Sequence, residues 1–269
     1  MLTTEIQSLG IVIEIGAMPV QVNSESPDFL AMLRERYAGY IGSSKDPEIT
    51  FDVQLGESRF PETDDSVQVT CKDGCWTFQR GDFRAEWKPS KRRGVIRQSA
   101  NPYSIDAVLR IVHSLTLVKN GGFLLHSASA IRNGRAFLFS GVSEAGKTTI
   151  SRLAPSDVTL LTDEISYVRK QENVYMAHGT PFTGELAKLG ENVTAPVAAL
   201  YFLSKGLENR IDPLSAGEAT RLLLSNQLFF AEDEHLVRQV FDSAFEFVSR
   251  VPVFRLTFFP DARVWELIR

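Results

Sequence analysis

Short runs of alternating apolar and polar residues recur along the first hundred positions, which is the pattern of half-buried β-strands. The strands predicted from this alternation cover residues 11–15, 50–55, 67–71, 76–78 and 83–87. One amphipathic helix is predicted at Asp28–Tyr37, with Phe29, Leu30 and Leu33 on its apolar face. The basic stretch Lys88–Arg93 is expected to be a linker or an exposed turn. Residues 1–95 are therefore predicted to form a β-rich N-terminal region.

A tight hairpin turn is predicted at Asp73-Gly74, between two of these strands. In that register Lys72 faces Cys75, so the two cysteines of the chain, Cys71 and Cys75, are not cross-strand partners. Two thiols are too few ligands for a metal site. We expect both cysteines to be reduced, as in a reducing compartment.

Beyond residue 95 the apolar residues recur every three or four positions, as they do along a helix that packs on a core. This helix is predicted to begin at Asn101-Pro102 and to end at Asn120-Gly121-Gly122. Its apolar residues are Ile105, Val108, Leu109, Val112, Leu115 and Val118. Further strands are predicted at 123–126, 127–132, 136–140, 158–161, 165–169, 174–177, 198–203 and 251–259, and further helices at 148–153, 215–224 and 232–250, with Asp261 capping a last short helix. Residues 96–269 are therefore predicted to form an α/β core.

The dipeptide Asn133-Gly134 lies between two β-prone runs and is a strong signal for a type I′ hairpin turn. The runs that it joins are Ser127–Arg132 and Ala136–Ser140. They should pair antiparallel, so the sheet is predicted to be mixed.

Residues 141–148 spell G-x-x-x-x-G-K-T, directly between an apolar strand and a predicted helix. That context is the one in which this motif forms a phosphate-binding loop, because the glycines let the backbone fold over the phosphates and the first helical amides point at the anion. Lys147 would reach the β- and γ-phosphates, and Thr148 would offer its hydroxyl to Mg²⁺. The candidate nucleotide-binding residues are Gly141, Ser143, Glu144, Ala145, Gly146, Lys147, Thr148 and Thr149. The alternative is an ordinary glycine turn between a strand and a helix.

Two acids, Asp163 and Glu164, follow an apolar strand about fifteen residues after Lys147. This spacing allows one short helical crossover and a return beside the loop strand, with the acids at the carboxyl end of the strand. One acid could act as general base on an acceptor hydroxyl while the other helps to hold the metal. The alternative is a pair of exposed acids in a turn. The polar stretch Gly179–Glu185 is expected to run on the surface.

His126 closes the apolar run that begins at Phe123. By itself, a histidine in this position is more often a packed or surface residue than a catalytic one.

The composition is that of an ordinary globular protein, with 269 residues, 43% hydrophobic and 23% charged residues, and a net charge of −4. No broad basic surface is implied, so a nucleic-acid partner is not expected. No apolar stretch is long enough to cross a bilayer. The start Met1–Glu5 lacks the basic and apolar parts of a signal peptide, so a cytoplasmic location is expected.

The order of these motifs resembles the catalytic domain of HPr kinase/phosphorylase and its relatives, among them kinases that act on lasso-peptide precursors. The shared features are Leu125-His126 at a strand end, the Asn133-Gly134 hairpin, G-x-x-x-x-G-K-T, Leu-Leu-Thr-Asp-Glu at 160–164 and Pro-Phe-Thr-Gly-Glu at 181–185. The resemblance covers residues 124–185 well, and it implies a mixed-sheet phosphate-loop core shared with phosphoenolpyruvate carboxykinase.

The resemblance also implies roles for single residues. His126 matches the active-site histidine, Asp163 the acid that acts as base for an acceptor serine, and Lys147 the loop lysine. Glu164, which stands where the family has a second aspartate, and Glu185 are implied to join the Thr148 hydroxyl around Mg²⁺. The arginine-glycine signature that follows the glutamate in the bifunctional enzyme is absent, since Leu186-Ala187-Lys188 follow here. Phosphorolysis, and HPr itself as substrate, are therefore not expected.

The leading hypothesis is an ATP- and Mg²⁺-dependent kinase that transfers the γ-phosphoryl group to a hydroxyl, with a peptide or protein serine as acceptor. Two alternatives stay open, a kinase for a small metabolite and a nucleotide-binding regulator with slow hydrolysis. The oligomeric state is open as well, a homo-oligomer included, and no membrane partner is expected.

Overall fold

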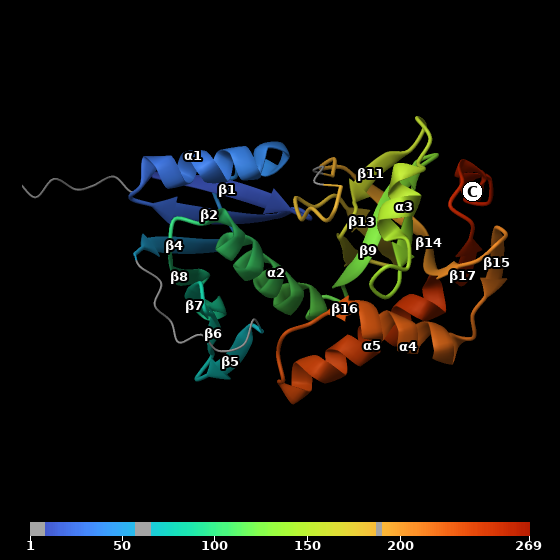
Figure 1. Ribbon diagram of the computed structural model, residues 1–269. Coiled ribbons are helices and arrows are strands. Elements are labelled where there is room, and N and C mark those ends of the chain that lie inside the picture. Colours follow the sequence, from blue (N-terminus) through green and yellow to red (C-terminus); the bar gives the residue numbers. More distant parts are fainter. Residues whose placement is uncertain (1–8, 57–65, 187–189) are drawn as a thin grey trace, which may run out of the picture. The chain divides into compact units, whose positions relative to one another are not determined.

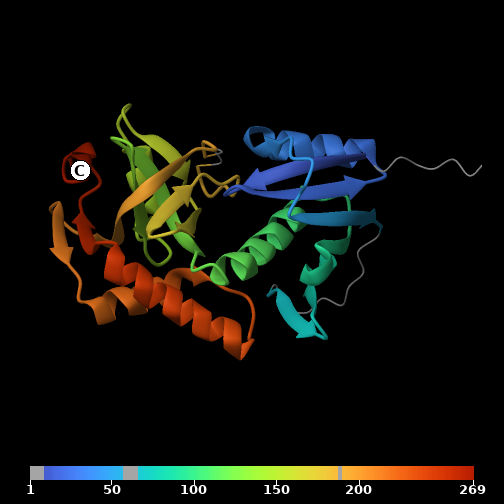
Figure 2. The same cartoon turned by 180° about the vertical axis from the view of Figure 1, so that it is seen from behind.

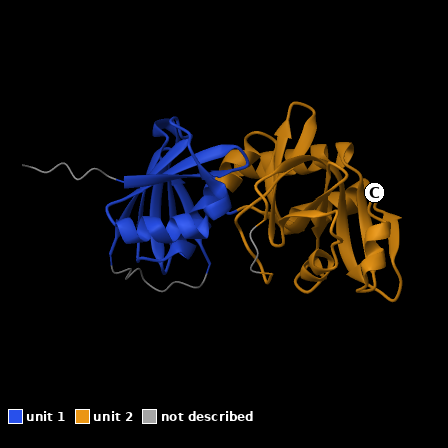
Figure 3. Cartoon of the chain, turned by 90° about the horizontal axis from the view of Figure 1, so that it is seen from above, with its two compact units in different colours: residues 1–112, 230–233 blue, residues 113–229, 234–269 orange. Residues whose placement is uncertain are grey.

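The computed structural model describes residues 9–56, 66–186 and 190–269, so Met1–Glu5 and Ala187-Lys188 lie outside the described residues. The chain divides into two compact units (Figure 3). Unit 1 comprises residues 1–112 and 230–233, and unit 2 comprises residues 113–229 and 234–269. The division falls inside helix α2 (Pro102–Val118), whereas the sequence placed the boundary between its two regions at residue 95.

Unit 1 is built on a mixed sheet with the strand order β3-β1-β2-β4-β8-β7-β6-β5 (Figure 1). The strands are β1 (Leu9–Ile15), β2 (Met18–Ser24), β3 (Ile41–Gly42), β4 (Ile49–Leu55), β5 (Gln68–Lys72), β6 (Cys75–Arg80), β7 (Phe83–Lys88) and β8 (Arg93–Gln98). Helix α1 (Pro27–Arg36) follows β2, and single 3-10 turns occupy Ala38–Tyr40 and Pro89–Lys91.

Most of the predictions for unit 1 are confirmed. Helix α1 begins after Ser26, whose hydroxyl accepts a hydrogen bond from the Phe29 amide, and it buries the predicted apolar face. In the β5–β6 hairpin Lys72 pairs with Cys75, and both cysteines are free thiols. The basic stretch after Trp87 is a turn that joins the paired strands β7 and β8, so it is not a linker. Strands β2, β3 and β8 were not predicted.

Unit 2 is built on a second mixed sheet. Its strands are β9 (Phe123–Arg132), β10 (Arg135–Ser140), β11 (Thr159–Thr162), β12 (Ile165–Gln171), β13 (Val174–His178), β14 (Thr194–Lys205), β15 (Arg210–Pro213), β16 (Gln227–Leu228) and β17 (Val253–Phe258). Its helices are α3 (Lys147–Arg152), α4 (Ala216–Asn226) and α5 (Glu234–Arg250), and a 3-10 turn covers Ala262–Glu266. The pairings β10–β9–β12–β13–β14–β10 form a closed circuit, with β17 and then β15 continuing beyond β14.

The sheet of unit 2 has an apolar core on each face. On one face Leu125, Leu138 and Val168 pack with Leu223 of α4 and Phe247 of α5. These two helices lie side by side in both views of the molecule (Figures 1 and 2). On the other face the core includes Ala128, Ala130, Phe137 and Phe139 of the sheet, Ile150 of α3, and Trp265 near the C-terminal end.

The predicted Asn133-Gly134 hairpin is confirmed. Both residues have the positive φ of a type I′ turn, 52° and 72°, and β9 pairs antiparallel with β10 from Arg132–Arg135 to Ser127–Ser140. Strand β10 is also parallel to β14, so the loop strand lies in a mixed sheet as expected.

Two predictions about unit 2 are wrong. Strand β11 does not return beside β10 but pairs with β9, because β14 already occupies the free edge of β10. The stretch that begins at Gly179 does not run on the surface as a whole, since residues 179–182 are buried. Its polar groups are satisfied inside the fold, where the Thr180 hydroxyl donates to the carbonyl of Ile165.

Candidate functional site

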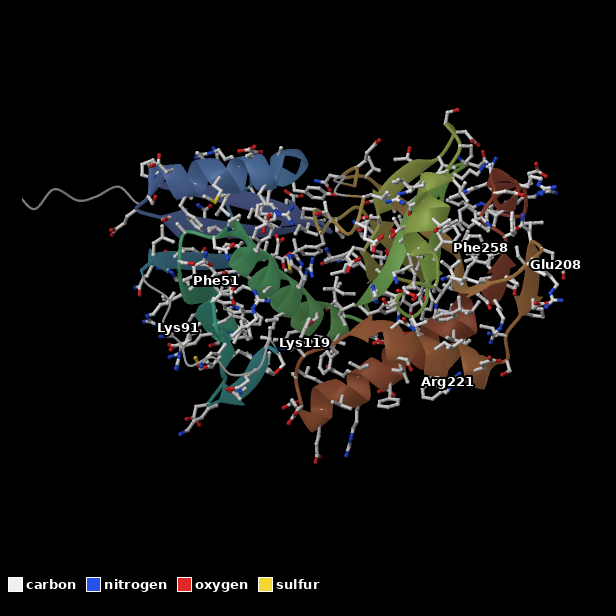
Figure 4. All side chains as sticks on the ribbon, in the orientation of Figure 1. Phe51, Lys91, Lys119, Glu208, Arg221 and Phe258 are labelled. Atoms are coloured by element: carbon white, nitrogen blue, oxygen red, sulfur yellow. The ribbon has the colours of Figure 1, made fainter. Side chains whose placement is uncertain are left out.

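The glycine-rich loop lies where β10 ends and α3 begins. Helix α3 starts at Lys147, and the residue before it, Gly146, has φ of 112°, a conformation that side chains rarely adopt. A Cβ atom at Gly146 would also lie 2.6 Å from the ring of Phe258, which is labelled in Figure 4. The last glycine of the motif is therefore required both by its backbone conformation and by the close approach of β17.

The Lys147 side chain is folded into its own loop. Only 8% of the residue is exposed, and Nζ donates hydrogen bonds to the carbonyl oxygens of Gly141, at 3.1 Å, and Val142, at 3.5 Å. Burial lowers the pKa of Lys147, while the negative charges of Glu164 and Glu185 act in the opposite direction. The loop therefore holds a poorly hydrated cation with two acids within electrostatic reach.

The rim of the loop consists of exposed residues. Val142, Ser143 and Glu144 are exposed, and Glu144 has a left-handed backbone conformation with φ of 62°. Thr148 and Thr149, in the first turn of α3, are half-buried. Val142, Ser143 and Glu144 are thus accessible to a ligand that lies above the loop.

Strand β9 connects the loop strand to His126. Ser140, the last residue of β10, pairs with Ser127, and its hydroxyl donates a hydrogen bond of 2.8 Å to the carbonyl oxygen of His126. Alternate residues of a strand point to the same face, so His126 shares its face of the sheet with Ala128 and Ala130. Those alanines pack in the core that contains α3, and His126 is therefore on the same side of the sheet as α3.

The acid pair lies on the other edge of β9. Strands β11 and β12 run one after the other along β9, and the amide of Ser127 donates to the carbonyl oxygen of Glu164 at 3.1 Å. Ile165 pairs with His126. The side chains of His126 and Glu164 meet there, with 3.8 Å between Nε2 and Oε1, and are 36% and 34% exposed. A single strand, β9, thus lies between the end of the loop strand and the acid pair.

Asp163 has a different environment from Glu164. It is only 4% exposed, and both carboxylate oxygens accept hydrogen bonds from backbone amides, Oδ1 from Gly184 at 2.8 Å and Oδ2 from Leu186 at 2.9 Å. A Cβ atom at Gly184 would lie 2.7 Å from Oε2 of Glu164 and 3.0 Å from Oδ2 of Asp163. The segment that carries Glu185 therefore packs directly on the acid pair.

The structure brings His126 together with Glu164 and places Glu164 and Glu185 within electrostatic reach of Lys147. Asp163 contacts the backbone around Glu185. Two residues that the sequence analysis did not single out also help to build the site, Ser140 and Gly184. A serine directly before the glycine loop and a glycine directly before an acid were the available signals, and neither is specific.

Oxygen donors at the site fit a hard cation. Thr148, Glu164 and Glu185 offer a hydroxyl and carboxylates, the kind of ligands that Mg²⁺ takes. Within the described ranges, no group of three or more His, Cys, Asp or Glu side chains could hold a metal ion by itself. This donor set suits a cation bound through one or two protein oxygens together with the phosphates of a substrate.

Two further observations concern the rest of the molecule. In unit 1 a cavity of about 560 Å³ is lined by residues 23–26 and 52–55, at the ends of β2 and β4, and none of the motif residues lines it. Among the helices of the described residues, none combines the length and the apolar character needed to span a bilayer.

Comparison with known proteins identifies the family of the chain. Residues 97–269 match the protein family described as "SynChlorMet cassette protein ScmC". The chain belongs to the ScmC family. The match covers all of α2, the glycine loop, the acid pair and the C-terminal strands, so every candidate site residue lies in the ScmC region.

No curated protein sequence matches this ScmC family member. The solved structures that are similar to it include the HPr(Ser) kinase/phosphatase from Coxiella burnetii. That similarity has 13% sequence identity and a TM-score of 0.30, and it covers 54% of this chain and 85% of the other.

Proposed function

We propose that unit 2 binds ATP with Mg²⁺ and transfers the γ-phosphoryl group to a hydroxyl, with a serine of a peptide or protein as acceptor. The observation that carries the proposal is the Lys147 ammonium group, buried in the glycine loop and within electrostatic reach of two carboxylates. The proposal is supported by the position of this glycine-rich sequence between a strand and a helix, which is typical of phosphate-binding loops.

The contacts of Lys147 explain why phosphate is the expected ligand. Its Nζ is held by two neutral carbonyl oxygens, those of Gly141 and Val142. Phosphate oxygens form shorter and stronger hydrogen bonds to an ammonium group than carbonyl oxygens do, because they are charged. A polyphosphate can therefore replace the carbonyls and remove the unfavourable burial of an unpaired cation.

The other residues supply what transfer to a hydroxyl requires. Thr148, with Glu164 or Glu185, would hold Mg²⁺, which neutralises charge on the phosphates when it is bound. A carboxylate of the 163–164 pair accepts the proton of the attacking hydroxyl. His126, with Nε2 at 3.8 Å from Oε1 of Glu164, would orient the Glu164 carboxylate.

A second candidate function has its own support. Both oxygens of Asp163 are engaged by backbone amides, which favours a structural role for the residue that the sequence suggested as base. A nucleotide-binding regulator with slow hydrolysis would need the same loop and metal ligands, but no efficient proton acceptor.

Replacement of the loop lysine tests nucleotide binding. Lys147→Ala should weaken binding of a fluorescent ATP analogue in the presence of Mg²⁺ by about 10- to 100-fold, because charged hydrogen bonds contribute about 1.5–3 kcal/mol each. Arg221→Ala, at an exposed cation of α4 in the same unit, is the matched control and should bind like the wild type. Equal affinities for the wild type and Lys147→Ala, with both proteins folded by circular dichroism, would refute the phosphate-loop interpretation.

Transfer itself is tested with ATP labelled at the γ-phosphate. Serine-containing peptides, small hydroxyl compounds and water are offered as acceptors. Label on a peptide serine supports the proposal, label only on a small compound supports a metabolite kinase, and slow release of inorganic phosphate alone supports the regulator.

A further inference from the structure

Asp163 accepts two hydrogen bonds from backbone amides, one on each side of a single residue. The amides that donate to its two oxygens belong to Gly184 and Leu186, the immediate neighbours of Glu185. Hydrogen bonds from backbone amides to an ionised carboxylate are about twice as strong as bonds between neutral groups. The backbone is therefore fixed on both sides of Glu185 by a single buried side chain.

The start of this segment is also tied to the sheet. The Thr162 hydroxyl donates to the carbonyl oxygen of Phe182 at 3.2 Å, and the Thr180 amide donates to the carbonyl oxygen of Leu161 at 3.1 Å. Gly184 then passes so close to the acid pair that a Cβ atom would collide with Glu164. Residues 180–186 consequently have a defined path along the end of β11.

Glu185 itself is exposed, yet its negative charge acts on Lys147. An exposed glutamate on a free loop would lose this effect to solvent and to its own mobility, because screening in water is strong. The hydrogen bonds of Gly184 and Leu186 therefore decide where the Glu185 carboxylate lies.

We propose that Asp163 is a positioning residue, which fixes the backbone on both sides of Glu185 and so holds the Glu185 carboxylate toward the glycine loop and its cation. The proposal rests on the proposed function, since it assigns a role within the same nucleotide site. It differs from the general-base role that the sequence favours for Asp163. A carboxylate that accepted a proton in every turnover would lose the charge that strengthens both amide bonds, and the segment would loosen each time.

The anchoring contact can be tested without nucleotide. In amide hydrogen exchange followed by NMR, the Gly184 and Leu186 amides should be protected in the wild type. Asp163→Asn should speed their exchange at least about tenfold, because the amide side chain carries no charge and offers only one acceptor oxygen. Glu164→Gln, at the adjacent residue, is the matched control and should leave both rates unchanged. Unchanged exchange in Asp163→Asn would overturn the proposal.

A double-mutant cycle tests whether Asp163 acts through Glu185. The variants are Asp163→Asn, Glu185→Gln and the double variant. The readouts are the Mg²⁺ concentration for half-maximal binding of a fluorescent ATP analogue, and phosphate release from ATP with water as acceptor. Each single variant should raise the Mg²⁺ requirement about tenfold, the double variant should match Glu185→Gln within about twofold, and saturating Mg²⁺ should restore most of the turnover of Asp163→Asn.

The opposite result assigns Asp163 to proton transfer. In that case Asp163→Asn keeps the wild-type Mg²⁺ requirement, loses about 10²–10⁴-fold in turnover at saturating Mg²⁺, and combines multiplicatively with Glu185→Gln. Failure of the proposed function looks different, because the wild type itself then does not bind the ATP analogue. In that case the proposed role of Asp163 toward the cation is refuted as well. The exchange experiment still tests whether Asp163 anchors the backbone on both sides of Glu185.

Discussion

The backbone at Gly184 lies very close to both acids of the pair Asp163 and Glu164. A methyl group there would lie 2.7 Å from Oε2 of Glu164 and 3.0 Å from Oδ2 of Asp163, and Asp163 is held in place by its two amide bonds. The Glu164 carboxylate is the group that can move away. A side chain at position 184 would therefore displace the Glu164 carboxylate.

Gly184→Ala should consequently lower turnover at least about tenfold with a modest loss of stability, since overpacking costs about 1–3 kcal/mol. Gly217→Ala is the control, because a Cβ at Gly217 meets nothing within 4 Å. Phosphate release and thermal unfolding are measured on both variants. Wild-type turnover in a folded Gly184→Ala protein would show that the position of Glu164 is not critical.

The Asn133-Gly134 turn could be predicted from the sequence, because the two residues themselves define the turn. The position of Lys147 between a strand and a helix could be predicted for the same reason, since its neighbours in the chain define it. The partners of Asp163 could not be predicted in this way. Its hydrogen bonds come from backbone amides about twenty residues later, and backbone donors leave no signature in the sequence.

Contacts from β17 and from the C-terminal turn hold the glycine loop and helix α3 in place. Phe258 of β17 packs against Gly146, and the Trp265 indole donates to the carbonyl oxygen of Ile150 in α3. Helix α3 has only six residues, so these contacts with the C-terminal strand and turn stabilise it more than its own hydrogen bonds do.

Gly146→Ala should weaken binding of the ATP analogue at least about tenfold, because the φ of 112° strains any side chain and the methyl group meets the Phe258 ring. Making room with Phe258→Leu in the same protein should not restore affinity, since the backbone strain persists. Recovery of affinity in the double variant would show that the collision alone is responsible. Isothermal titration provides the affinities.

The sequence predicts where strands and helices lie along the chain better than it predicts which strands pair with one another. The hairpin β9–β10 was predictable because its two-residue turn fixes both partner and register. The pairing of β11 with β9 was not, because the local sequence does not show which strands occupy the two edges of the loop strand. One edge of β10 is taken by β9 and the other by β14, which lies far along the chain, so β11 pairs with β9.

Unit 2 as a whole contains a buried pair of histidines. His113 of α2 contacts the Tyr167 hydroxyl through Nδ1 at 3.3 Å, and His178 contacts the Thr194 hydroxyl through Nδ1 at 2.8 Å. Burial lowers the pKa of His113 to about 3 and that of His178 to about 4, with the positive charge of Arg169 acting in the same direction. Both rings are therefore neutral in the folded protein near neutral pH.

This pair predicts a loss of stability in acid. An unfolded histidine takes up a proton near pH 6.5, whereas the folded pKa values are depressed, so the unfolded state binds more protons below pH 6.5. The free energy of unfolding should fall as the pH falls from about 6.5 toward 4, by up to about 1.4 kcal/mol per pH unit for each histidine.

Urea unfolding at several pH values measures this slope. His178→Gln keeps a polar side chain beside Thr194 but does not titrate, so its slope should be reduced by the contribution of one histidine. The control is His235→Gln, at an exposed histidine of α5, which should keep the wild-type slope. A slope in His178→Gln equal to that of the wild type would contradict the prediction.

The position of β9 between later strands has a consequence for synthesis of the chain. As the polypeptide leaves the ribosome, β9 and β10 can form their hairpin at once, but Phe137 meets Ala199 only about 60 residues later, and Leu124 meets Leu228 about 100 residues later. Until then the hairpin presents unsatisfied edges and apolar faces, a state that is prone to aggregation. The β9–β10 hairpin therefore gains its remaining strand partners only after most of unit 2 has been synthesised.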